Sequence, residues 1–164
     1  MRIVAGTARS RTILAPEGRD TRPTLDRVRE NLFNILQWHC RDAQVLDLFA
    51  GSGALALEAL SRGAAGAVLA DRDPRAVRIE RQNVENLGFA DRARVIQAEW
   101  QETLRRLAAE NMTFQLVFLD PPYAMKDLSA VFEALRSGGM IDETSLIVVE
   151  HKAEDVPFVG DGFI

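Results

Sequence analysis

The strongest constraint on the fold is an alternation of short apolar runs with segments of helical periodicity. Five such runs cover residues 44–49, 67–71, 94–97, 116–119 and 146–150, and a stretch with helical spacing follows each of the first four. Short, mostly apolar strands separated by helices are typical of a parallel sheet with helices on both faces. Parallel neighbours need crossovers, which we expect to be right-handed. The sequence therefore predicts an α/β fold.

The helices between these strands have recognisable starts. A first helix begins at Thr24 or Asp26, and others are expected near 55–60, 74–88, 103–109 and 128–135. Residues 1–14 alternate loosely around a Gly6-Thr7 turn, which predicts a short β-hairpin. No linker divides the chain, so we expect one domain over residues 1–164, with a basic arm at 1–23 and a core at 24–164.

Composition excludes several classes of protein. The only cysteine is Cys40, so no internal disulfide can form, which fits a reducing cytoplasm. The two histidines and the cysteine have no metal-site spacing. Asp47 and Glu58 interrupt the best candidate for a membrane span. We therefore expect a cytoplasmic protein with no metal and no membrane partner.

Charge is distributed unevenly along the chain. The net charge is −4, but residues 1–29 contain seven arginines and three acids, a balance of +4 that leaves −8 for the remainder. This asymmetry indicates a basic arm on an acidic body, a pattern that suits nucleic-acid binding. A solvated arm with scattered arginines explains the same charges equally well.

A glycine turn follows the first strand in "VLDLFAGSGALALEAL". Gly51 and Gly53 allow close approach of a ligand to the backbone, and ligands of parallel sheets bind at the carboxyl ends of strands. The turn also satisfies the Gly-x-Gly-x-x-Gly/Ala dinucleotide pattern, and Asp71 lies about twenty residues further on, where an acid binds ribose hydroxyls. The turn alone is therefore compatible with both NAD and S-adenosylmethionine.

Acidic residues at the strand ends favour the second cofactor. Asp47 can address the ammonium group of a methionine moiety, whereas it would repel a pyrophosphate. Capping of the turn is the alternative role for Asp47. Asp71, Glu99 and Asp120 stand at or near the ends of the next three strands, and Asp73 before Pro74 is expected to cap a helix.

The fourth strand ends in "FLDPPYAM". Pro121 and Pro122 have no N–H group, so the loop offers acceptors and almost no donors. The Asp120 carboxylate and the Pro121 carbonyl could accept hydrogen bonds from both N–H groups of a planar amine, while Tyr123 stacks on a flat ring. Such acceptors would aim the amine lone pair at a methyl sulfonium, through positioning and local electrostatics. The alternative is a proline turn with Tyr123 in the core.

The motifs "LDLFAGSGALALEALSRGA" and "FLDPPY" resemble class I S-adenosylmethionine-dependent methyltransferases that act on exocyclic amines. The segments "MRIVAGTARSRTI" and "TRPTLDRVRENLFNIL" are similar to the RsmD family, which methylates guanine N2 in small-subunit ribosomal RNA. The resemblance covers essentially residues 1–150. It implies a Rossmann-like class I methyltransferase sheet, mostly parallel, with S-adenosylmethionine as cofactor and S-adenosylhomocysteine as product. It also implies a monomer whose partner is 16S rRNA or the assembled small subunit.

The resemblance implies roles for individual residues. The cofactor would be held by Asp47, Phe49, Ala50, Gly51, Ser52, Gly53, Asp71, Arg72, Glu99, Trp100 and Asp120. The target guanine would be held by Asp120, Pro121, Pro122 and Tyr123, and the RNA by Arg2, Arg9, Arg11, Arg22, Thr24, Arg27 and Arg29.

The sequence departs from the family pattern in two places. Glu99 stands where the family more often has aspartate, which implies a longer or shifted adenine contact. The family usually continues through a closing hairpin, whereas only "VPFVGDGFI" remains here, so we expect the last strands of the sheet to be missing.

Other functions explain part of the pattern. Methyltransferases of DNA adenine N6 or of protein glutamine share the acid-or-amide-Pro-Pro-Tyr loop, although a glutamine enzyme would not need an arginine-rich arm. An NAD-binding oxidoreductase would need a placed acid–base residue, and His39 and His151 are in no evident active-site position. A non-catalytic RNA-binding module would leave the glycine turn unexplained.

Overall fold

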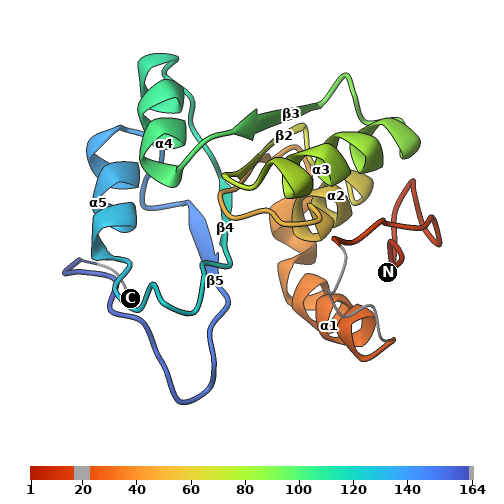
Figure 1. Cartoon of the computed structure of the whole chain (residues 1–164), viewed down its shortest axis with the longest axis horizontal. Helices are drawn as coiled ribbons and strands as arrows, with labels where there is room; N and C mark the ends of the chain where they lie inside the picture. The colour runs from red at the N-terminus through yellow and green to blue at the C-terminus, as the bar shows by residue number, and fades with distance from the viewer. Residues whose placement is uncertain (17–22, 163–164) are drawn as a thin grey trace.

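A computed structural model describes residues 1–16 and 23–162, with side chains of the first helix described from Asp26 onward. The strands are β1 (Gln44–Asp47), β2 (Gly66–Asp71), β3 (Ala93–Gln97), β4 (Leu116–Leu119) and β5 (Leu146–Val149). The helices are α1 (Pro23–Cys40), α2 (Ala54–Ser61), α3 (Pro74–Asn86), α4 (Trp100–Ala109) and α5 (Ser129–Ser137). The strands form one parallel sheet in the order β3-β2-β1-β4-β5 (Figure 1), which confirms the predicted α/β fold.

Helices cover both faces of this sheet, because alternate side chains of each strand point to opposite sides. Val45 and Phe118 pack in a core cluster with side chains of α1, α2 and α3. Leu46 and Val117 pack in a second cluster with side chains of α4 and α5. The central strands are therefore buried on both faces, which explains why they read as continuous apolar runs in the sequence.

The N-terminal segment, residues 1–16, folds back as predicted, with three backbone hydrogen bonds between residues 1–3 and 10–13, but its pairing is short and it packs on the body. The chain folds back at Gly6 but forms a single antiparallel bridge, between Arg2 and Thr12, rather than a ladder of paired strands. Ile3 and Ile13 are 1% exposed because they pack into the core of the domain. The loose apolar alternation in the sequence thus marks residues that dock on the body rather than residues of a free arm.

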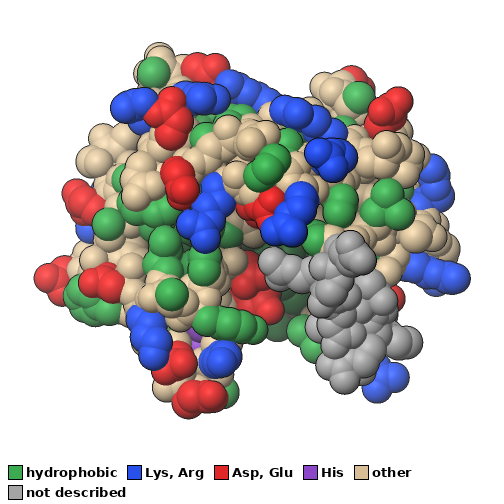
Figure 2. Space-filling view, in the orientation of Figure 1, with side chains coloured by type: hydrophobic (Ala, Val, Ile, Leu, Met, Phe, Trp, Pro, Cys, Tyr) green, Lys and Arg blue, Asp and Glu red, His purple; other side chains and the backbone are tan. Residues whose placement is uncertain are grey.

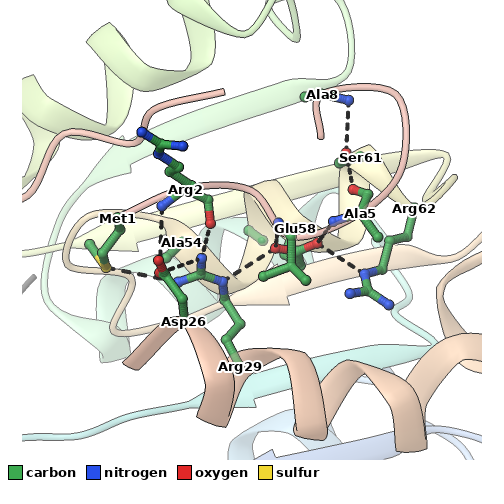
Figure 3. Close-up of polar contacts among 12 residues, drawn as sticks. Met1, Arg2, Ala5, Ala8, Asp26, Arg29, Ala54, Glu58, Ser61 and Arg62 are labelled. Carbon is green, nitrogen blue, oxygen red and sulfur yellow. Dashed lines mark hydrogen bonds and ion pairs between the residues drawn. The ribbon is translucent and has the colours of Figure 1, made fainter. Parts of the chain in front are cut away.

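Buried polar groups of α2 hold this segment in place (Figure 3). Glu58 is fully buried, and its carboxylate accepts hydrogen bonds from the amides of Val4 (2.8 Å) and Ala5 (3.1 Å). Its charge is balanced by Arg29 Nε at 3.3 Å and Arg62 Nε at 3.0 Å. The arginine of α1, the carboxylate of α2 and the N-terminal backbone therefore form one buried network.

Several boundaries differ slightly from the prediction. Strand β1 ends at Asp47, two residues before the predicted end, because the chain leaves the sheet to form the glycine turn. Helix α4 begins at Trp100 rather than Thr103, with Glu99 at its N-cap position. Within residues 150–162 the chain adds no further strand to the sheet and makes one isolated bridge, between Asp127 and Phe158. Among the described residues, no helix is long and apolar enough to cross a membrane.

Candidate active site

The candidate site lies where the chain leaves the carboxyl ends of β1 and β4. These strands are neighbours in the middle of the sheet, with Asp47 of β1 in register with Phe118 of β4. The strand order reverses here: on one side of β1 lie β2 and β3, and on its other side lie β4 and β5. Such a switch point is where open parallel sheets bind ligands. It places the glycine turn beside the Asp-Pro-Pro-Tyr loop.

The glycine turn has the backbone that its sequence requires. Gly51 and Gly53 adopt positive φ angles of 57° and 82°, which favour glycine. A Cβ added at Gly53 would lie 2.6 Å from Leu69 Cδ2, so this glycine also permits close packing on β2. A Cβ added at Gly51 would meet nothing within 4 Å. The turn therefore packs tightly on one side and leaves room on the other.

Asp71 shapes this turn from the end of β2. Its Oδ2 accepts a hydrogen bond from the Gly51 amide at 3.0 Å, and its Oδ1 accepts one from the Asp73 amide at 2.9 Å. Asp73 in turn caps α3, as expected, by accepting from the Arg75 amide. The partly buried Asp71 carboxylate therefore lies against the turn, in a position where it can accept further bonds from ribose hydroxyls.

Asp47 is a buried carboxyl beneath the same turn. It is 1% exposed, and its Oδ2 accepts a hydrogen bond from the Ala56 amide at 3.3 Å. The pKa of Asp47 is raised to about 7, mainly by burial; the hydrogen bond from the Ala56 amide opposes this rise, and the charges of Asp120, Asp71 and Glu150 add to it. Four carboxyl groups thus converge here, and a cationic ligand would relieve their repulsion.

A second buried acid, Glu80 of α3, also lies against the glycine turn. It is fully buried, its Cγ lies 3.7 Å from a Cβ placed at Gly53, and neither carboxyl oxygen has a hydrogen-bond partner. Burial raises its pKa to about 9, with Asp47 and Asp71 contributing. Glu80 is therefore a neutral acid at pH 7, and it adds no charge to the site.

The remaining predicted cofactor residues line the strand ends around the turn. Phe49 is partly buried and Ala50 is buried, and Ser52 Oγ accepts a hydrogen bond from the Ala54 amide at 3.3 Å. Arg72 and Glu99 are exposed, with 3.9 Å between Arg72 Nη1 and Glu99 Oε1. Trp100 is partly buried at the start of α4 and packs on the second core cluster. Figure 2 shows acidic side chains near the centre of this face, with Lys and Arg side chains around them.

The Asp-Pro-Pro-Tyr loop directly follows β4. The Pro122 carbonyl accepts a hydrogen bond from the Met125 amide at 2.9 Å, which closes a turn. Tyr123 is 73% exposed, so it is not a core residue. Lys152 Nζ lies 4.4 Å from the centre of the Tyr123 ring. The loop borders a small pocket whose other wall comes from the segment after β5, including Glu150, His151 and Lys152.

The arginines expected to bind RNA divide into two groups. Arg2, Arg9, Arg11 and Arg27 are exposed. Arg29 is 5% exposed and paired with Glu58 and Asp26, so its guanidinium is not free to meet a phosphate, and the expectation for Arg29 is corrected to a structural role. Arg22 and the side chain of Thr24 lie outside the described residues.

Sequence reasoning missed four residues around the site: Glu58, Glu80, Asn83 and Lys152. The first three are polar residues at core-facing helical positions, and that placement was the available signal. Lys152 gave no signal, since only the folded chain brings it to Tyr123. No group of three or more His, Cys, Asp or Glu side chains in the described ranges could hold a metal ion.

Comparisons with known proteins agree with this geometry. The family model described as "Conserved hypothetical protein 95", the RsmD family, matches residues 1–160. Ribosomal RNA small subunit methyltransferase D of Escherichia coli K12 is 43% identical over 157 residues, which cover 94% of this chain and 76% of that protein.

Solved structures add to the comparison. A hypothetical protein of Thermus thermophilus has a TM-score of 0.79 at 37% identity, covering 94% of this chain and 87% of that one. An O-methyltransferase of Bacillus cereus in complex with SAH has a TM-score of 0.62 at 18% identity, over 80% of this chain and 58% of that one, which supports the fold alone. The chain therefore belongs to the RsmD family, which its glycine turn, its Asp-Pro-Pro-Tyr loop and its arginine-rich N-terminus indicated.

Proposed function

We propose that the chain transfers a methyl group from S-adenosylmethionine to the exocyclic N2 amine of a guanine in 16S rRNA. The observation that carries this proposal is the adjacency of the glycine turn and the Asp-Pro-Pro-Tyr loop at the switch between β1 and β4. One motif offers space for a cofactor, and the other offers acceptors and an exposed ring to a planar amine. The name of the Escherichia coli relative supports RNA of the small subunit as the substrate class.

The residues at the strand ends fit this cofactor. Its ammonium and sulfonium groups are cationic, and Asp47, Asp71, Asp120 and Glu150 create a negative potential at the place where they would bind. We assign the methionine end to Asp47 and the glycine turn, and the ribose to Asp71. We assign the adenine to the region of Glu99 and Trp100. When bound, the cofactor supplies an electrophilic methyl group.

The chain's own residues would position the amine. The Asp120 carboxylate and the Pro121 carbonyl accept hydrogen bonds from the two N–H groups of the amine. These bonds direct the nitrogen lone pair toward the methyl group. The reaction forms a nitrogen–carbon bond, breaks the methyl–sulfur bond and releases one proton from the amine. Tyr123, which is exposed, stacks on the unstacked base, as enzymes that act on bases require. Catalysis by this route needs orientation and electrostatics rather than a covalent intermediate.

A substrate panel tests this function. Methyl-labelled S-adenosylmethionine is offered with small subunits, naked 16S rRNA, DNA and release factor in separate reactions. We expect label in rRNA, either naked or assembled, and little in DNA or protein. Asp120→Ala should abolish the transfer. Asp127→Ala is the matched control, since Asp127 is an exposed acid whose Oδ1 accepts a hydrogen bond from the Ser129 amide. Label in DNA or release factor alone would contradict the substrate, and full rRNA methylation by Asp120→Ala would contradict the mechanism.

The same proposal sets the expectations for assembly and location. We expect a monomer, which light scattering of the purified chain can measure. We also expect the protein in the cytoplasm, where small subunits are assembled.

A further inference from the structure

Asn83 is a buried amide in the last turn of α3 that no part of the proposed chemistry uses. It is fully buried, yet its side chain makes three hydrogen bonds, all to backbone groups. Its Oδ1 accepts from the Leu14 amide at 2.8 Å, and its Nδ2 donates to the carbonyls of Leu14 and Ser52, both at 2.9 Å. Both hydrogens of the side-chain amide are therefore in use.

The two segments that Asn83 joins are far apart in the sequence. Leu14 belongs to the N-terminal segment, and Ser52 is the middle residue of the glycine turn. The bond to the Ser52 carbonyl restrains the peptide plane between Ser52 and Gly53, whose amide donates to the Ala50 carbonyl at 2.7 Å. The conformation of the cofactor turn thus depends on a side chain that the N-terminal segment also holds.

The N-terminal segment is fixed to the body at other points. The Glu58 carboxylate accepts hydrogen bonds from the amides of Val4 and Ala5. The Thr7 amide donates to the Ser61 carbonyl, and the Ala8 amide donates to the Ser61 hydroxyl. These contacts lie on α2, whereas Leu14 binds α3. The segment therefore spans both helices that follow the glycine turn and β2. Its exposed arginines Arg9 and Arg11 lie between the two anchors in the sequence, and Arg11 Nη2 donates to the Asn86 carbonyl at the end of α3.

We propose that Asn83 is a positioning residue for the glycine turn, and that it couples docking of the N-terminal segment to cofactor binding. The inference deepens the proposed function and rests on it for the identity of the cofactor. Coupling between two sites is reciprocal. Docking of the segment therefore strengthens cofactor binding, and bound cofactor strengthens docking to the same extent.

Two variants test the coupling from opposite ends. Asn83→Ala removes the side chain that hydrogen-bonds to the Leu14 amide and to the carbonyls of Leu14 and Ser52. Gly6→Ala acts far from the turn, because its added Cβ would lie 1.9 Å from the Ser61 carbonyl oxygen and would displace the segment from α2. The matched control is Gln82→Ala. Gln82 is exposed, lies next to Asn83 in α3, and its side-chain amide donates to Asn86 Oδ1 at 2.8 Å within the same helix.

The first readout is hydrogen exchange of the ligand-free protein, and the second is binding of S-adenosylhomocysteine by calorimetry. We expect both variants to speed exchange in residues 50–54 as well as in residues 1–14. We expect each to weaken S-adenosylhomocysteine about tenfold or more, as the loss of buried hydrogen bonds implies. Gln82→Ala should change neither.

The outcomes separate the inference from the proposed function. If Gly6→Ala speeds exchange in residues 1–14 but leaves residues 50–54 and the affinity unchanged, the segment and the turn are independent and the coupling is wrong. If exchange in residues 50–54 is the same in Asn83→Ala as in the wild-type chain, Asn83 does not position the turn. If the wild-type chain binds no S-adenosylhomocysteine while exchange responds as expected, the proposed cofactor fails and the structural coupling stands.

Discussion

At the scale of single residues, buried acids set the electrostatics of the site. Asp47 has a folded-state pKa of about 7, well above its ordinary value of 3.8. A raised pKa means that folding favours the protonated form, so this contribution to stability is complete below about pH 4 and is lost as pH rises through about 7. The free protein therefore holds Asp47 partly protonated at neutral pH.

This titration predicts a pH dependence of cofactor binding. A cationic ligand favours the charged form of Asp47, so binding should release a proton and the affinity for S-adenosylhomocysteine should rise between pH 6 and pH 7.5. Calorimetry in two buffers of different ionisation enthalpy measures the proton release. Asp47→Asn should bind more weakly, and its affinity should vary less with pH. An affinity of the wild-type chain that stays constant over this range would place Asp47 outside the cofactor site.

At the scale of elements, the contact between the N-terminal segment and α2 is the least expected feature. Its centre is the Glu58 carboxylate, which is fully buried and serves two backbone amides and two arginines. Removing one partner from a buried ionic network leaves the others desolvated and unpaired.

We therefore expect Glu58→Gln to destabilise the fold strongly. The loss should be about 3–5 kcal/mol, since the buried Arg29 would lose the Glu58 carboxylate and keep only the ion pair with the partly buried Asp26 among those described. Glu102→Gln is the control: Glu102 pairs with Arg105 and Arg106 on the surface of α4, and exposed pairs are worth about 0–1 kcal/mol. Denaturant unfolding of the two variants measures the difference. Equal stability of Glu58→Gln and Glu102→Gln would contradict the role of this network.

The elements were predictable where local pattern and tertiary burial agree. The five strands and their parallel arrangement follow from apolar runs that end near acids. The candidate site stays a prediction from the glycine turn and the Asp-Pro-Pro-Tyr loop, which follow neighbouring strands of the sheet. The hairpin pairing was predictable, but its docking on the core was not, because alternation at Ile3 and Ile13 reports burial and does not say against what. The structural roles of Asn83 and Glu58 could not be predicted from the sequence, because only the fold brings their partners to them. These partners are Leu14 and Ser52 for Asn83, and Val4 and Ala5 for Glu58.

At the scale of the whole molecule, charge is separated between two functions. Acidic groups gather at the carboxyl ends of the strands, where a cationic cofactor would bind, and exposed arginines lie on the N-terminal segment. The chain as a whole has a net charge of −4, and the part after residue 29 carries −8, so this acidic body would repel RNA unless the basic segment directs it.

Removing the exposed arginines should therefore affect RNA more than cofactor. We expect the double variant Arg9→Ala, Arg11→Ala to weaken rRNA binding and to reduce its salt slope by about 2, because each lost phosphate contact removes roughly one released counterion. Binding measured at several salt concentrations gives this slope. Arg105→Ala, an exposed arginine of α4 on the other face of the sheet, should leave it unchanged. An unaltered slope in the double variant would remove the segment from the RNA interface.

The identity of the methylated nucleoside tests the central claim most directly. Small subunits, or naked 16S rRNA if that is the better acceptor, are incubated with methyl-labelled S-adenosylmethionine and the wild-type chain. The rRNA is then digested to nucleosides and separated beside standards. The account predicts label in N2-methylguanosine and none in other nucleosides. Label in a methylated adenosine or cytidine, or no transfer to rRNA at all, would contradict it.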